Sequence, residues 1–318
     1  MPFKTHARIA FAALASLAFA GAAAAADCAP SKWGADDEIG SANLVTSEQV
    51  LMASKLVKKG MSAPLGITIS RDTPAFAPRS LSMQVVQPGQ NGGKDPLGYG
   101  GGGVYNDDII QMWFGIGSQI DGLGHLGDDG RYYNCNKAAD ISAITGLTKL
   151  GVHNVPPLVG RGVVIDMAKH FGKPFLEAGH AITADDVKAA MAEQKIEVKK
   201  GDVVLFHTGW TDAKLESAPQ EWGTGEPGIM PDVAEMLAAA DVMAVGADTW
   251  GVDVVPPPAG AKVFYSHVVL LRDNGIYILE TMNTGPLVEA GVSEFMFVLG
   301  QARVKGSVQM VINPVALW

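Results

Sequence analysis

The pattern of apolar and polar positions, together with signals at the helix starts, predicts three helices. Two of them span residues 46–57, where apolar side chains recur on one face of a helix, and residues 183–194. Each of these two segments starts with a threonine that is followed three residues later by Gln49 or Asp186, which is the spacing of a capping box. A third helix is predicted over residues 231–240, because proline is typical of the first helical position.

Short apolar runs bounded by turn residues predict strands. Two longer runs near the C-terminus, residues 295–304 and 308–316, predict a closing β-hairpin. Because strands and helices are mixed along the chain without an internal repeat or a linker, the sequence predicts a single α/β domain. The other predicted strands are residues 65–70, 82–87, 109–116, 163–167, 202–207, 242–247 and 275–279.

Residues 87–104 predict a long loop, since residues 100–103 are four consecutive glycines. Such a run costs too much backbone entropy to form a regular element. A phosphate-binding loop would need a following helix and a Lys-Ser/Thr pair, and the segment has neither. A flap near a functional site and a plain surface loop both fit the sequence.

The first 26 residues have the order of a secretory signal peptide. Lys4 and Arg8 supply positive charge, an apolar run follows, and a string of small residues ends at Ala26. The apolar run is too short for a permanent membrane span, which needs about 20 apolar residues. We therefore expect export to the periplasm or the medium, with residues 27–318 as the mature domain.

The charge balance limits the classes of partner. With 24 basic and 33 acidic side chains, the chain has a formal net charge of −9 at neutral pH. An acidic chain without a basic cluster argues against binding to nucleic acid or to anionic membranes, because both attract positive surfaces. We therefore expect a small molecule as the partner, and no membrane association after the signal peptide is cleaved.

Cys28 and Cys135 are the only cysteines. Both follow the predicted cleavage site, and an exported protein meets oxidising conditions in which a disulfide persists. The sequence does not show whether the two Cα atoms lie close enough for a bond. A disulfide and two separate thiols are equally compatible with the sequence.

A glycine-rich segment after a predicted strand contains the first candidate site. In an extended chain Gln119 and Asp121 project to the same face, because side chains alternate. Gly122 and Gly124 permit a turn that brings His125 back toward Asp121. An amide oxygen, a carboxylate and an imidazole that converge can bind a divalent cation. Without a metal the same groups form a structural hydrogen-bond network, and the local pattern is compatible with both interpretations.

A second candidate segment runs from His267 to Glu280. A turn at Asp273-Asn274-Gly275 separates His267 from an apolar strand that ends at Glu280. A carboxylate at the exit of a buried strand is well placed for a functional site. A solvated glutamate at the end of a strand is the alternative.

Together the two segments resemble the cyclase family, which includes bacterial kynurenine formamidases, isatin hydrolases and a trans-dienelactone hydrolase. The family motif His-x-Gly-Thr-His-x-Asp-x-Pro-x-His is matched in frame by residues 115–125, and the second signature is matched by His267 and Glu280. The resemblance extends from about Lys32 to the C-terminus. Further stretches that match family segments in order are residues 33–40, 43–46, 208–210 and 246–250.

The resemblance implies an α/β fold with a mixed, barrel-like β core and flanking helices, assembled as dimers or larger oligomers. Gly115 and Gln119 stand where the family has two metal-binding histidines. Gly115 offers no ligand, whereas Gln119 offers a neutral amide oxygen. We therefore expect one divalent ion, Mn²⁺ or Zn²⁺, instead of two. Its predicted ligands are Asp121, His267 and Gln119, with Glu280 or His125 as a further ligand.

The activity that the resemblance implies is hydrolysis of an amide, a cyclic amide or a lactone by water that the metal activates. In that reaction His125 acts as general base and then as general acid, with Asp121 as its catalytic neighbour. We expect a ring-containing substrate, because aromatic side chains are available to line a pocket. The predicted substrate-binding residues are Trp113, His207, Trp210 and Trp250, with Phe114 and Tyr99 as further aromatic candidates.

Two other functions fit the sequence. The altered positions Gly115 and Gln119 are compatible with an exported small-molecule-binding protein that has lost turnover. A metal-dependent lyase or dehydratase is also compatible, because an activated water can serve as a base. A Ser-His-Asp hydrolase is disfavoured, since the chain has no Gly-x-Ser-x-Gly elbow.

Overall fold

The computed structural model describes Met1, residues 28–86 and residues 106–318. The predicted signal peptide and the predicted glycine-rich loop, including Tyr99, lie outside the described residues. Nine strands form the main sheet: β1 (Ser62–Pro64), β4 (Gln119–Asp121), β7 (Leu158–Asp166), β9 (Val203–His207), β11 (Ala244–Ala247), β12 (Tyr277–Glu280), β13 (Glu294–Leu299), β14 (Gln309–Val311) and β15 (Val315–Leu317). Three small two-stranded sheets pair β2 (Leu81–Val86) with β3 (Asp107–Met112), β5 (Ser142–Ala143) with β6 (Gly146–Leu147), and β8 (Ala181–Ile182) with β10 (Gly228–Ile229).

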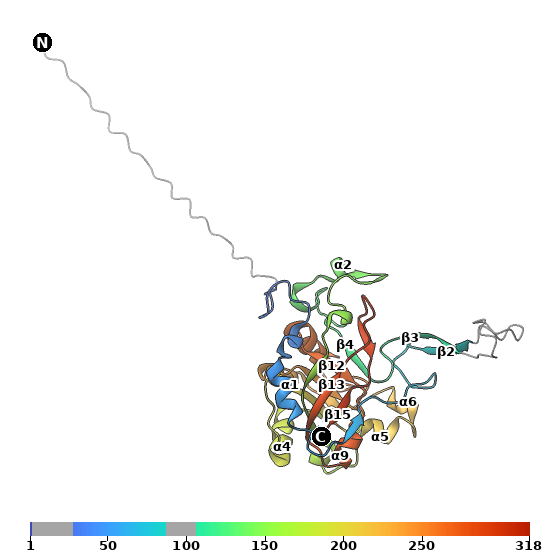
Figure 1. Cartoon of the computed structure of the whole chain (residues 1–318). Helices are drawn as coiled ribbons and strands as arrows, with labels where there is room; N and C mark the ends of the chain where they lie inside the picture. The colour runs from blue at the N-terminus through green and yellow to red at the C-terminus, as the bar shows by residue number, and fades with distance from the viewer. Residues whose placement is uncertain (2–27, 87–105) are drawn as a thin grey trace, which may run out of the picture.

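Helices flank the main sheet (Figure 1). They are α1 (Ser47–Ser54), α2 (Ala138–Ile141), α3 (Met167–His170), α4 (Ala184–Gln194), α5 (Trp210–Lys214), α6 (Pro219–Trp222), α7 (Pro231–Ala239), α8 (Tyr265–His267) and α9 (Gly285–Glu289). Four further short helical turns are η1 (Gly40–Leu44), η2 (Tyr133–Cys135), η3 (Val152–Asn154) and η4 (Val268–Asp273). Helices α1 and α4 pack against β7, and α7 packs against α4 and η4. No helix within the described residues is both long and apolar enough to cross a bilayer.

The main sheet is mixed and curls into a half-barrel, with the strand order β1-β15-β13-β7-β9-β11-β12-β4-β14. Its centre, β7 to β12, is parallel, and the strands on either side of it are antiparallel. Every residue of β9, β11 and β12 is buried, as expected for parallel strands that are covered on both faces. This confirms the predicted single α/β domain with a barrel-like mixed β core and flanking helices.

Local sequence signals are confirmed at the helix starts. Thr183 and Asp186 form a complete capping box at α4, in which each side chain accepts from the other residue's backbone N–H. At α1 the Thr46 side chain accepts from the backbone N–H of Gln49, but the Gln49 amide instead donates to the Lys200 carbonyl. The proline that opens α7 stands at its first position, as predicted.

Two strand predictions are wrong. Residues 65–70 do not form a strand, because side chains take their backbone donors: Ser118 Oγ accepts from the Ile67 N–H and Thr73 Oγ1 from the Ser70 N–H. The predicted C-terminal hairpin is divided as well. Pro314, which has no N–H to donate, separates β14 from β15. As a result β15 pairs with β13, whereas β14 pairs with β4.

The predicted strand over residues 109–116 is also divided. Its first part belongs to β3, which within the described residues pairs only with β2, and this pair of strands projects from the body of the molecule (Figure 1). The chain then turns and enters the main sheet as β4. This turn directs residues 119–121 into the sheet interior, where β4 lies between β12 and β14.

The structure answers the question about the two cysteines. Cys28 and Cys135 form a disulfide, and their Cα atoms are 5.7 Å apart. The bond connects the N-terminal part of the described chain to η2, which follows the candidate site in sequence.

Candidate metal centre

Strand β4 presents two polar side chains to a buried space. Gln119 and Asp121 are 1% and 0% exposed, although both are polar. In the antiparallel register between β4 and β12, Gln119 is opposite Glu280. Side chains that alternate along β4 and residues that face each other across the ladder share one side of the sheet. The sheet therefore brings Gln119, Asp121 and Glu280 to one face.

Glu280 is the last residue of β12, and an unusual backbone follows it. Thr281 has φ +53°, a conformation that β-branched residues rarely adopt. Two hydrogen bonds hold it there: the Thr281 N–H donates to the Thr249 carbonyl at 2.7 Å, and the Ser118 hydroxyl donates to the Thr281 carbonyl at 2.5 Å. Backbone strain of this kind concentrates at functional sites, where it fixes the direction of a neighbouring side chain.

His267 enters the site from α8, which is preceded by Phe264 with φ +54°. The Phe264 ring packs edge-on against the His267 ring, with centroids 5.4 Å apart. On the far side of the imidazole, His267 Nδ1 donates to Asp253 Oδ2 at 2.6 Å, and Asp253 Oδ1 accepts from the Ser266 N–H at 2.8 Å. When the imidazole is neutral, this carboxylate favours the tautomer that carries its proton on Nδ1 and leaves the Nε2 lone pair for a cation.

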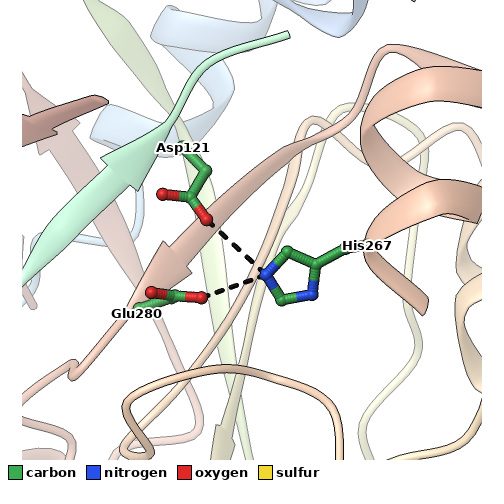
Figure 2. A group of neighbouring side chains, drawn as sticks. All are labelled: Asp121, His267 and Glu280. Atoms are coloured by element: carbon green, nitrogen blue, oxygen red, sulfur yellow. Dashed lines mark hydrogen bonds and ion pairs between the residues drawn. The ribbon is translucent and has the colours of Figure 1, made fainter. Parts of the chain in front are cut away.

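The Nε2 atom of His267 faces two carboxylates (Figure 2). His267 Nε2 is 3.1 Å from Glu280 Oε1 and 3.6 Å from Asp121 Oδ2. One donor atom from each of the three residues lies within 4.8 Å of the others, and all three residues are buried. Two carboxylates and one imidazole are a donor set that divalent cations such as Zn²⁺ and Mn²⁺ accept.

The two carboxylate oxygens of Asp121 differ in their hydrogen bonding, and this difference bears on whether a cation fits between the three residues. Asp121 Oδ1 accepts from Gln119 Nε2 at 3.2 Å and from Gln309 Nε2 at 2.7 Å. Asp121 Oδ2 is buried and has no hydrogen-bond partner among the described residues. An unpartnered buried carboxylate oxygen is costly unless a cation or proton satisfies it. The donor set therefore fits a metal ion.

Burial and charge act against each other on the pKa values at this centre. Burial alone would raise the pKa of Asp121, but His125 and His267 hold it well below its ordinary value. Burial would lower the pKa of His267, but the neighbouring carboxylates of Asp121, Asp253 and Glu280 raise it well above its ordinary value. Burial, together with the Asp121 charge, raises the pKa of Glu280 to about 7. Competition for protons among neighbouring groups is typical of functional sites.

His125 returns toward Asp121 as the sequence predicts, with His125 Nε2 3.8 Å from Asp121 Oδ2. The backbone turn is closed by a hydrogen bond from the His125 N–H to the Gly122 carbonyl at 2.9 Å. Gly122 and Gly124 do not have a positive φ, so glycine is needed here because neighbouring atoms lie close to the backbone. A Cβ on Gly122 would lie 2.7 Å from the Val308 carbonyl oxygen. The His125 side chain is 21% exposed, so it borders the buried group from the solvent side.

Gln119 contacts the cluster through its amide nitrogen. Gln119 Nε2 donates to Asp121 Oδ1 and to Glu280 Oε2. The amide therefore bridges the two carboxylates and orients them. In this arrangement the Gln119 amide nitrogen holds the two carboxylates, whereas the sequence predicts the Gln119 amide oxygen as a direct metal ligand.

The predicted substrate-binding residues are scattered. Trp113 is half exposed and lines a surface pocket of about 480 Å³ that also includes Phe114 and Gln309. Trp210 is fully buried, and its ring packs near Phe175 with centroids 6.4 Å apart. Trp250 lies beside the cluster, because its ring packs against Phe264, which in turn contacts His267.

His207 points away from the cluster. Gly246 pairs with Leu279, so the next residues, Ala247 and Glu280, lie side by side on β11 and β12. Ala247 also pairs with Phe206 on β9, so the Phe206 side chain lies on the same face of the sheet as Glu280. His207 therefore projects to the opposite face, where its Nδ1 is 2.8 Å from Thr284 Oγ1. This placement fits a structural histidine at the end of a strand, whereas the sequence predicts His207 as a substrate-binding residue.

Four residues that border the cluster have no signal in the sequence. Asp253 orients His267, and Gln309 reaches Asp121 only because β14 pairs with β4 in that register. Glu226 is fully buried, and burial raises its pKa well above the ordinary value. Arg79 lies beside Gly115. Their sequence separations from the ligands follow no helical or strand period, so only the tertiary fold shows them.

Comparisons with known proteins concern the family and the fold of this chain. The model of the cyclase family, described as "Putative cyclase", matches residues 63–254. A comparison with curated proteins finds no match. Among solved structures, one described as a novel cyclase is 28% identical, with a TM-score of 0.81 over 90% of this chain and 98% of that chain.

Two more distant structures share the fold. An isatin hydrolase bound to the product analogue thioisatinate is 19% identical, with a TM-score of 0.61 over 86% of this chain and 99% of that chain. A "potential metal-dependent hydrolase with cyclase activity" is 16% identical, with a TM-score of 0.52 over 80% of this chain and 98% of that chain. Because the family model covers more than half of its residues, this chain belongs to the cyclase family.

Proposed function

We propose that this protein is a metal-dependent hydrolase that opens an amide, a cyclic amide or a lactone. The observation that carries the proposal is the buried group of Asp121, His267 and Glu280, in which Asp121 Oδ2 has no hydrogen-bond partner among the described residues. The hydrolase and metal-dependent neighbours of the same fold add support.

The ligands in this proposal are Asp121, His267 and Glu280, with Mn²⁺ or Zn²⁺ as the cation. When bound, such a cation lowers the pKa of a coordinated water toward ~7 and polarises a carbonyl oxygen. Asp253 holds the His267 tautomer that presents Nε2, and Gln119 and Gln309 hold the Asp121 carboxylate. These supporting contacts keep the ligand atoms in place before a substrate arrives.

His125 is the proton-transfer group in the proposed reaction. Burial lowers the pKa of His125, so the imidazole is neutral near pH 7 and can accept a proton. It borders the ligand group and stays partly exposed, which suits a side chain that receives a proton from water and returns it to the leaving group. Its position outside the three-residue group supports a role as base instead of ligand.

We also propose that the protein is exported. The order of charge, apolar core and small residues in the first 26 positions supports this. The Cys28–Cys135 disulfide adds support, because disulfides persist in oxidising compartments.

Ring opening in heavy-oxygen water tests the proposed reaction. Isatin, an aryl amide and an aryl lactone would be incubated with the protein as purified, after chelation, and after Mn²⁺ or Zn²⁺ is added back. We expect one labelled oxygen in an acid product, loss of turnover after chelation, and recovery with metal. Turnover that persists without metal would contradict the proposal.

The same assay separates the two alternatives. Substrate binding without turnover in every metal-loaded sample would favour the small-molecule-binding protein that Gly115 suggests. Product formed without incorporation of the heavy oxygen would favour a lyase.

A further inference from the structure

Strands β2 and β3 form an arm that stands apart from the main sheet (Figure 1). Within the described residues they pair only with each other, and neither packs extensively against another described helix or strand. A sheet of two strands is at best marginally stable in water unless its apolar face packs against something else. The arm therefore needs a packing partner from outside its own pair of strands.

One face of the arm is apolar and open to solvent. Leu81, Met83 and Val85 alternate along β2, so their side chains project to the same side. The residues opposite them on β3, which share this side, are Met112, Ile110 and Asp108. Met83 is 47% exposed, Val85 58% and Ile110 53%. Apolar side chains gathered in this way on a surface mark an interaction site.

A groove of about 540 Å³ lies along this apolar face. The arm forms one wall of the groove with Leu81, Met83, Val85 and Ile110, and residues 69–72 form the other wall. The chain thus carries both an apolar arm and an apolar groove beside it. Under a two-fold axis, each of two copies can insert its arm into the groove of the other, and such an interface closes on itself.

The charges on the two walls are complementary, which favours a second copy as the occupant. Arg71 is exposed on the wall opposite the arm, and Asp108 is exposed on the apolar side of the arm, near the tip of its described part. Neither side chain forms an ion pair within residues 28–86 and 106–318. When two arms pack antiparallel, Asp108 of one copy approaches Arg71 of the other, and the two-fold axis forms this pair twice. An anionic membrane is a poorer occupant, because Asp107 and Asp108 lie at the end of the arm.

We propose that the apolar face of the arm and the groove beside it are the interface of a homodimer, in which each copy inserts its arm into the groove of the other. The residues of this interface are separate from Asp121, His267 and Glu280. The inference therefore does not depend on the proposed function, and its test needs neither metal nor substrate.

Sedimentation equilibrium on the purified, disulfide-bonded protein measures the dissociation constant of the dimer. Met83→Asp places a charge on the apolar face, and the matched control Met61→Asp makes the same change at a methionine that is 52% exposed beside β1, at the opposite edge of the main sheet from β14. Arg71→Glu and Asp108→Arg each bring like charges together in a dimer of one variant. In an equal mixture of these two variants, the mixed dimer has opposite charges at both pairs. Circular dichroism checks that every variant is folded.

We expect a dimer for the wild type and for Met61→Asp, and a dissociation constant at least about tenfold higher for Met83→Asp, because its charge would be buried in the interface. Arg71→Glu and Asp108→Arg alone should each weaken the dimer about tenfold, whereas their mixture should dimerise about as tightly as the wild type. A monomeric wild type, an assembly larger than a dimer, or a dimer that Met83→Asp leaves unchanged would overturn the proposal. A mixture that dimerises no better than either variant alone would overturn it as well, because only arms that cross between copies can restore the pairs.

Discussion

Asp253 and His267 form a buried pair in which His267 Nδ1 donates to Asp253 Oδ2 at 2.6 Å. The bond turns the other ring nitrogen toward Glu280 and Asp121. A carboxylate behind a ligand histidine fixes both its tautomer and its orientation. In the proposed function, the pair therefore holds His267 in the orientation that a cation would need.

Asp253→Asn should weaken metal binding about tenfold to a hundredfold, because outer partners of ligand histidines have effects of that size. The oxygen of the introduced amide would satisfy the Ser266 N–H, so the amide N–H would face His267 Nδ1 and favour the wrong tautomer. Competition titration with a metal-binding dye measures the affinity. Asp273→Asn, which changes a surface carboxylate paired with Arg272, is the control and should bind metal normally. Unchanged affinity in Asp253→Asn would contradict this role.

His125→Ala should lower turnover about a hundredfold or more while most of the metal stays bound. His125 lies outside the three-residue ligand group, and its Nε2 is 3.8 Å from Asp121 Oδ2. Loss of a general base costs about a hundredfold or more in rate. Metal analysis and turnover on the same preparation separate the two roles. Metal lost together with activity would assign His125 to the ligands.

Metal affinity should fall as the pH decreases from about 8 to about 6, because protons and the cation compete for the same atoms. Burial acts to lower the pKa of His267, but three neighbouring carboxylates raise it well above its ordinary value. Without a metal the imidazole is therefore charged, with a proton on each nitrogen, and the cation must displace the proton on Nε2. Burial raises the pKa of Glu280 to about 7, so this carboxyl also gains a proton on acidification. Each proton displaced changes the affinity about tenfold per pH unit.

Calorimetry in buffers of different ionisation enthalpy counts the protons released when Mn²⁺ or Zn²⁺ binds. Asp273→Asn again serves as the control, and it should release the same number as the wild type. An affinity that does not change with pH, with no proton release, would show that the ligands lie elsewhere.

The disulfide should contribute substantially to stability. Cys28 and Cys135 are 107 residues apart in sequence, and closing a loop of that length in the unfolded chain is worth about 4–5 kcal/mol on the chain-entropy account. Urea unfolding of Cys28→Ser/Cys135→Ser beside the wild type measures the loss, and reductant should have the same effect on the wild type alone. Equal midpoints for the two proteins would contradict this prediction.

Much of the fold was predictable because its local signals are strong. The capping box at Thr183 and Asp186 and the buried strands β9, β11 and β12 appear in the structure close to where the sequence predicts them. The wrong assignments involve pairing over long range. The sequence predicts one strand over residues 308–316. Nothing in it shows that the part before Pro314, β14, pairs with β4 while the part after it, β15, pairs with β13.

The site was predictable in part for the same reason. Asp121 and His125 share one short segment, and strand alternation with a tight glycine turn is enough to bring them together. Asp253 and Arg79 come from distant segments, and no periodicity links them to the ligands. The left-handed Thr281 could not be predicted either, because its conformation is imposed by hydrogen bonds from residues elsewhere in the fold.

Metal content measured by plasma mass spectrometry, with wild type beside Asp121→Ala, tests the central claim most directly. The three-residue group of Asp121, His267 and Glu280 predicts about one Mn²⁺ or Zn²⁺ per chain in the wild type. The variant should lose the ion, while His170→Ala, at a surface histidine paired with Glu193, should retain it. No bound metal after incubation with excess Mn²⁺ and Zn²⁺, or an ion that Asp121→Ala retains, would contradict the account.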